Sequence, residues 1–172
     1  QRASFGKIAN EVKKDFEGIK TSVPDSPPTL AVFATQDEYR KFTPRFAEML
    51  LGSASPPTSG GYTVNSIATS SWDPSKGTMR PVYFHEMLHS WMDKVCGFPS
   101  SNGDWIQEGF ANYYQLMFFP QDDLGQIILD GIGNPKMHMP LKELCSGKRI
   151  PMDRYWQALS VIAMLENKDG YK

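Results

Sequence analysis

The chain has 172 residues, of which 40% are hydrophobic and 22% charged, and its net charge at pH 7 is −1. This size and composition are typical of one soluble globular domain with a sizeable core. The near-neutral charge argues against a nucleic-acid partner, because phosphate contacts need a basic patch. No apolar run approaches the roughly 18 residues of a membrane span, and the sequence shows no signal peptide.

The first part of the chain predicts helices and short strands in alternation. Apolar residues three and four apart predict an amphipathic helix over residues 1–20, and residues 29–35 read as a buried strand. Residues 36–51 also have helical spacing. Because Pro44 lies inside them, this segment is either a kinked helix or two shorter pieces. Residues 62–70 alternate loosely and predict a strand with one face in solvent.

Two longer helices are predicted in the middle of the chain. The first runs from Pro81 to a stop near Gly97, since proline suits a first helical position and glycine suits a C-terminus. The second begins at about Asp104, because Asp104 and Gln107 have the spacing of a capping box. It ends before Pro120, which cannot continue a helix.

The last part of the chain predicts a short helix over residues 122–130, an irregular stretch over 131–146 and a final helix over 153–167. The order of the predicted elements, strands first and helices afterwards, indicates an α+β fold. We therefore expect a single domain with a sheet-bearing part, about 1–97, and a mainly helical part, about 98–172.

The sequence H-E-x-x-H lies within the first of the two longer helices, at His85, Glu86 and His89. Residues four apart lie on one face of a helix, so both imidazoles can reach a single metal ion. Glu86 then projects close to that ion, where it can take a proton from a metal-bound water. The alternative is two histidines that occur by chance on a core helix.

Glu108 supplies a candidate third ligand, with eighteen residues between it and His89. That length allows the motif helix to end, a loop to reverse the chain and the next helix to present a carboxylate. A catalytic zinc site takes three protein ligands and leaves the fourth position to water. His85, His89 and Glu108 meet this requirement without a cysteine.

These two motifs resemble those of the gluzincin metallopeptidases in the thermolysin-like zincin superfamily. The second one, W-I-Q-E-G-F-A-N-Y-Y at residues 105–114, is similar to the W-x-x-E-G-x-A-x-Y pattern of the peptidase-MA-like family. The resemblance implies a thermolysin-like zincin domain that hydrolyses peptide bonds with Zn²⁺. It makes His85, His89 and Glu108 the zinc ligands and Glu86 the general base that activates a zinc-bound water.

Asn112 departs from the pattern of that superfamily. Thermolysin-like enzymes commonly have an acid at this position, hydrogen-bonded to a ligating histidine; asparagine can accept that bond but brings no charge. The departure permits one alternative to the peptidase, a catalytically weak or inactive zinc-binding module that recognises a protein or peptide. A structural protein with a chance motif is a separate alternative.

The resemblance also suggests candidates for the donor that stabilises the oxyanion during peptide hydrolysis. Tyr155 begins a segment that is similar to the catalytic-tyrosine helix of the aminopeptidase N group, and it is the favoured candidate. His138 is the alternative, by analogy with a late histidine of thermolysin. Tyr113 and Tyr114 are interpreted as core and rim residues of their helix.

The expected substrate is a peptide or protein that pairs with an edge strand formed by residues 62–70, as in this superfamily. The aminopeptidase N group has a G-x-M-E-N signature there, whose acid captures a free amine. Residues 60–65 read G-G-Y-T-V-N and contain no acid. We therefore expect endopeptidase-like cleavage, or an enzyme for an unusual small substrate, rather than a strict aminopeptidase.

Two cysteines leave the cellular compartment open from composition alone. Cys96 and Cys145 have no zinc-knuckle or C-x-x-C spacing, and they are either one disulfide or two buried thiols. Many peptidase-MA-like proteins are exported from bacteria, so the resemblance implies a periplasmic or extracellular protein. The sequence does not indicate an oligomeric state.

Overall fold

A computed structural model describes residues 10, 12, 14, 16, 28–52, 59–76, 80–96 and 104–167. The chain divides into two compact units, Gln1–Gly97 and Phe98–Lys172. The described part has a three-stranded sheet and six α-helices, so the α+β class is confirmed. The elements are β1 (Thr29–Phe33), α2 (Gln36–Leu51), β2 (Gly61–Val64), β3 (Ile67–Ser71), α3 (Pro81–Trp91), α4 (Asp104–Phe118), α5 (Leu124–Gly133), α6 (Leu141–Leu144) and α7 (Tyr155–Glu166).

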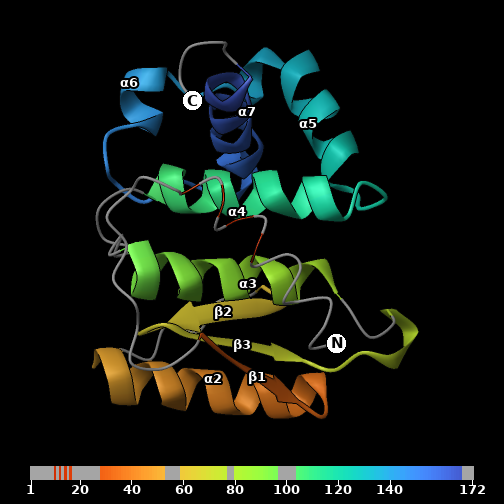
Figure 1. Cartoon of the computed structure of the whole chain (residues 1–172), viewed down its shortest axis with the longest axis vertical. Coiled ribbons are helices and arrows are strands. Elements are labelled where there is room, and N and C mark those ends of the chain that lie inside the picture. Colours follow the sequence, from red (N-terminus) through yellow and green to blue (C-terminus); the bar gives the residue numbers. More distant parts are fainter. Residues whose placement is uncertain are drawn as a thin grey trace. The chain divides into compact units, whose positions relative to one another are not determined.

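The first unit is a sheet covered on both faces by helices. Its strand order is β1-β3-β2, with β1 parallel to β3 and β2 antiparallel to β3. Figure 1 shows α2 on one face of this sheet and α3, the motif helix, on the other. Among the described strands, β2 therefore has one neighbour and β3 has two. This arrangement places the motif helix directly over the sheet.

The expectation of one strand over residues 62–70 is wrong, because these residues form the β2–β3 hairpin. Val64 pairs with Ile67, and Asn65 and Ser66 form the two-residue turn between them. Both turn residues have positive φ angles, 48° and 61°, as a type I′ hairpin turn requires. An Asn-Ser pair between β-forming residues is a weaker turn signal than Asn-Gly, which is why the sequence reading passed over it.

The expectation that one face of this segment lies in solvent is also wrong for β3, because both faces of that strand are buried. Its residues Thr69, Ser70 and Ser71 are at most 1% exposed although they are polar. Their hydroxyl groups are satisfied: Thr69 Oγ1 donates to the Tyr62 carbonyl at 2.8 Å and Ser70 Oγ to the Gly60 carbonyl at 2.6 Å. Short polar side chains are tolerated in the core when they are hydrogen-bonded in this way.

Helix α2 runs without interruption from Gln36 to Leu51 with Pro44 inside it, so the alternative of two shorter pieces is wrong. The Thr35 side chain caps its N-terminus by accepting from the Glu38 amide at 3.1 Å. Gly52 ends it in the left-handed conformation, with φ of 67°. Both helix ends are therefore fixed by local capping residues.

The motif helix α3 begins at Pro81, as predicted, and is followed by one π-helical turn over Met92–Cys96. The predicted helix over residues 1–20 lies mostly outside the described residues. Of its apolar face, Val12 and Phe16 are described, and both are buried. The ring of Phe16 meets that of Trp91 edge to face, with centroids 5.1 Å apart. The end of α3 is thus packed against the N-terminal segment.

The second unit is built on the packing of α7 across α4, with α5 also against α7 (Figure 1). A Cβ atom added at Gly109 of α4 would lie 2.8 Å from Ile162 Cγ1 and 2.9 Å from the Ala158 carbonyl oxygen. These two helices can approach so closely because Gly109 has no side chain. The close crossing sets the position of α4 residues relative to the first turn of α7.

Two predictions for the second unit need correction. The helix expected over 122–130 is α5, which continues to Gly133, and the stretch 131–146 expected to be irregular contains the short helix α6. Cys145 is exposed and has a free thiol, so the disulfide with Cys96 is not formed. No helix in the described ranges has the length and hydropathy needed to cross a bilayer.

Substitution Gly109→Ala tests the close crossing of α4 and α7. We expect a loss of about 1–3 kcal/mol in the free energy of unfolding, because the new methyl group overpacks the contact and one of its neighbours is backbone. Gly125→Ala is the matched control, since its Cβ would meet only Leu116 Cδ1 at 3.9 Å. The control should be neutral or stabilising by up to about 1 kcal/mol. Urea denaturation of both variants measures the difference; equal stabilities would contradict the close packing.

Candidate metal centre

Helix α3 brings the two motif histidines together within the first unit. His85 and His89 lie one turn apart, both half-buried, and their Nε2 atoms are 3.1 Å apart. The ring centroids are 4.8 Å apart and the ring planes are inclined by 75°. The sequence prediction that both imidazoles present a nitrogen to one point is therefore met within the helix.

The separation of these nitrogens fits coordination of one zinc ion. Two ligands at about 2.0–2.1 Å from a tetrahedral zinc are roughly 3.3 Å apart from each other. The observed 3.1 Å differs from this value by an amount that a small side-chain rotation removes. No change in the backbone of α3 is needed to hold a metal ion.

Glu86 is buried beside the histidines, with 7% of its surface exposed. The Thr63 hydroxyl on β2 lies 2.7 Å from Glu86 Oε2 and 2.9 Å from the Glu86 main-chain carbonyl oxygen. Gly61, two residues earlier on the same strand, leaves the room for the Glu86 side chain. The sequence reading identified Glu86 but missed Thr63 and Gly61, because neither belongs to the motif.

The charge of Glu86 also acts on the interior of the first unit. Tyr39 of α2 is 2% exposed. Burial, followed by the negative charge of Glu86, raises the pKa of Tyr39 to about 12. The Tyr39 hydroxyl donates to the Ser59 carbonyl at 3.4 Å. Tyr39 therefore remains a neutral phenol on the side of the sheet opposite to α3, and it adds no second charge near the buried acid.

In the second unit, Glu108 lies on the first turns of α4, and α7 places Tyr155 against it. The Glu108 carboxylate is near enough to the Tyr155 hydroxyl to affect its ionisation. Burial is the largest cause that raises the pKa of Tyr155, and the negative charge of Glu108 follows. Tyr155 is thus a neutral phenol close to a predicted ligand.

Asn112 is 6% exposed, and its side-chain amide donates to the main-chain carbonyl of Glu108 at 2.7 Å. This contact links Asn112 to the helical turn that carries Glu108. A hydrogen bond that the Asn112 oxygen accepts from a ligating histidine stays a prediction. The neutral amide is suited to this contact because a main-chain carbonyl needs a donor, which a carboxylate at this position would not supply.

His138, the alternative oxyanion donor, is engaged within the second unit. Its Nε2 atom lies 3.0 Å from the Gly131 carbonyl oxygen, and its ring is 5.7 Å from that of Trp156. The neighbouring residue Met139 is held by Gln157 of α7 through bonds to its amide and carbonyl, at 2.8 and 2.7 Å. Use of His138 in catalysis would require breaking its contact with Gly131.

Three residues form a group that could hold a metal ion: His85, His89 and Glu108. Each of them offers one atom that can ligate a metal ion. All three side chains are half-buried. The donor set of two imidazoles and one carboxylate is the one that the sequence analysis predicted, and it suits zinc.

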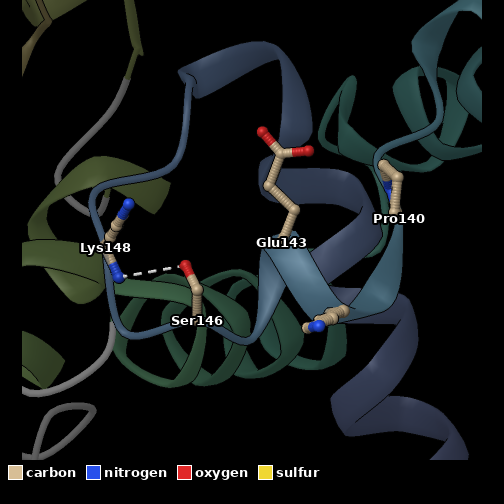
Figure 2. A pocket seen from close by; sticks show the side chains of 5 residues that line it. Pro140, Glu143, Ser146 and Lys148 are labelled. Carbon is tan, nitrogen blue, oxygen red and sulfur yellow. Dashed lines mark hydrogen bonds between the residues drawn. The ribbon is translucent and has the colours of Figure 1, made fainter.

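A hollow on the surface of the second unit involves none of these residues. Figure 2 shows it beside α6, where Pro140, Glu143, Ser146 and Lys148 line it together with Lys142. The Lys148 amide donates to Ser146 Oγ at 3.4 Å. Glu143 is the only one of its lining residues of a type found in metal sites with His and Glu ligands, so the candidate site remains the His-His-Glu group.

Comparisons of this chain with protein-family models, with curated proteins and with solved structures gave no match.

Replacement of a ligand tests the metal centre. We expect His89→Ala and Glu108→Ala each to weaken zinc binding by more than ~100-fold, since loss of a supporting outer residue alone costs about 10–100-fold. Titration calorimetry with Zn²⁺ measures the affinities. His138→Ala is the matched control, because His138 is the remaining histidine of the chain and contacts Gly131 instead. Equal affinities for all three variants would contradict the assignment.

Proposed function

We propose that the protein is a zinc-dependent metallopeptidase of the gluzincin type, similar to the peptidase-MA-like family, with endopeptidase-like cleavage. The observation that carries the proposal is the arrangement on α3: two imidazole nitrogens 3.1 Å apart with a buried carboxylate on the adjacent residue. Glu108 belongs to the same candidate ligand group. A structural helix with chance histidines has no need for a buried acid beside them.

The residues of the chain would divide the reaction as follows. His85, His89 and Glu108 would hold the zinc ion, which when bound supplies Lewis acidity to the scissile carbonyl and lowers the pKa of a water molecule. Glu86 takes the proton of the attacking water and passes it to the leaving amine. Tyr155 donates a hydrogen bond to the oxyanion that develops on the carbonyl.

Strand β2 is the proposed platform for the substrate. Among the described strands it pairs with β3 alone, whereas β3 pairs on both sides. The proposed platform is therefore β2. Strand β3, the second half of the strand expected over residues 62–70, is paired on both sides and has no edge for a peptide. An extended peptide can add to a free strand edge through main-chain hydrogen bonds. Residues 60–65 contain no acid to bind a free amine, which supports cleavage within a chain.

A catalytically inactive zinc module is the second candidate function. Asn112 favours it, because the amide bonds to the Glu108 carbonyl and brings no negative charge to increase the basicity of a ligand. The module would bind zinc and recognise a peptide without cleaving it. Stoichiometric zinc together with failure to cleave any member of a broad peptide library would favour the module over the peptidase.

Glu86→Gln tests the general base. We expect zinc content to stay at one per chain and kcat for peptide hydrolysis to fall by about 10²–10⁴-fold, since the amide cannot accept the proton. Glu143→Gln, the same change at an exposed acid of α6, is the control and should keep wild-type kcat. Metal analysis and a peptide-library assay give both readouts. Equal hydrolysis by wild type and Glu86→Gln would refute the role.

Tyr155→Phe separates two roles for this hydroxyl. If it binds the oxyanion, kcat falls by about 10²–10³-fold while zinc affinity stays close to that of the wild type, and this is the result we expect. If its main task is to support Glu108, zinc affinity falls by about 10–100-fold and kcat at saturating zinc is retained. Calorimetry and steady-state kinetics on the same preparation distinguish the two results.

A further inference from the structure

We infer that Thr63 is a positioning residue for Glu86, and that strand β2 fixes the general base while presenting its edge to the substrate. The inference deepens the proposed function and rests on it. Neither Thr63 nor Gly61 belongs to the H-E-x-x-H motif, and the two come from a different element of the first unit. Their contacts with Glu86 are the basis of the assignment.

Thr63 contacts Glu86 at two atoms. Its Oγ1 lies 2.7 Å from the carboxylate oxygen Oε2 and 2.9 Å from the main-chain carbonyl oxygen of the same residue. A threonine hydroxyl has one proton, and a hydrogen bond to an ionised acceptor is shorter and stronger than one to a neutral acceptor. The carboxylate is therefore the preferred acceptor, and the main-chain contact keeps the hydroxyl over the same turn of α3.

Gly61 shapes the other side of the Glu86 pocket. A Cβ added there would lie 2.5 Å from Glu86 Cγ, 2.8 Å from Glu86 Oε1 and 2.7 Å from Val82 Cγ2. Any side chain at this position would displace the acid or α3. Gly61 and Thr63 are two residues apart, so they lie on the same face of β2. One face of the strand thus provides both the space and the donor for a single carboxylate.

Catalysis by a general base depends on such a fixed position. A glutamate side chain has three rotatable bonds, and a base must lie within hydrogen-bond reach of the proton that it accepts. A displacement of about 1 Å can cost about 10²-fold in rate. The Thr63 hydroxyl removes rotational freedom from Glu86 before substrate arrives. Because the main chain of β2 also offers the pairing edge, substrate register and base position are set by one rigid element.

The kinetic test compares Thr63→Val with Thr63→Ser. Valine keeps the branched shape and removes the donor, whereas serine keeps the hydroxyl. We expect Thr63→Val to lower kcat by about 10–100-fold with KM within about twofold, because the β2 main chain is unchanged. Thr63→Ser should restore kcat to within a few-fold of wild type. Zinc content should be the same in all three proteins.

Thr43→Val is the control, since it makes the same change at a buried threonine whose hydroxyl donates to the Tyr39 carbonyl at 2.6 Å and not to Glu86. It should keep wild-type kcat. Wild-type kcat in Thr63→Val, or equal losses in Thr63→Val and Thr63→Ser, would overturn the positioning role. A rise in KM with unchanged kcat would also overturn it.

A second readout is independent of activity. Crystal structures of the metal-free wild type, Thr63→Val and Thr63→Ser should show Glu86 in the Thr63-bonded conformation in the first and third proteins and rotated or multiply placed in the second. An unchanged Glu86 in Thr63→Val overturns the inference whatever the kinetics show. Absence of hydrolysis in the wild type refutes the proposed function alone, and the crystal structures still decide whether Thr63 fixes Glu86.

Discussion

The first unit is organised around the burial of one carboxylate. Glu86 is 7% exposed, and a buried charge is costly unless hydrogen bonds replace its water. The neighbouring elements meet this need: β2 offers the Thr63 hydroxyl at 2.7 Å and no side chain at Gly61, and Tyr39 stays a neutral phenol because the charge of Glu86 adds to the effect of its burial. Helix α3 can lie close on the sheet only because β2 accommodates this acid.

The second unit shows that a motif can combine chemistry with packing. Gly109, the residue after Glu108, has no side chain. Helix α7 can therefore cross α4 with the Ala158 carbonyl oxygen only 2.9 Å from the position that a Gly109 Cβ would occupy. That crossing places Tyr155, the first residue of α7, close enough to Glu108 for the carboxylate to raise its pKa. The glycine of the motif therefore has a structural reason that is separate from metal binding. A larger residue there would separate the acid from this phenol.

Local geometry explains which features the sequence could predict. The sequence could predict that His85 and His89 share one face of a helix, because that depends only on their separation of four residues. It could also predict where the helix starts, because that depends on Pro81 alone. The contacts of Glu86 with Thr63 and Gly61 depend instead on which strand lies under α3, and nothing in the sequence near Glu86 specifies that strand. The burial of the polar residue Ser70 was missed for the same reason, since helices α2 and α3 cover the two faces of the sheet.

The turn at Asn65 and Ser66 connects the fold of the hairpin to the position of the base. A two-residue turn fixes the pairing of Val64 with Ile67, and a slip of one residue would turn every side chain of β2 to the opposite face. Tyr62 and Val64 would then face α3 in place of Gly61 and Thr63, and Glu86 would lose both its space and its donor. The Ser90 hydroxyl of α3 donates to the Ser66 carbonyl, one helical turn beyond Glu86. The motif helix is therefore tied to the turn that sets the register, so the hairpin and the general base are positioned together.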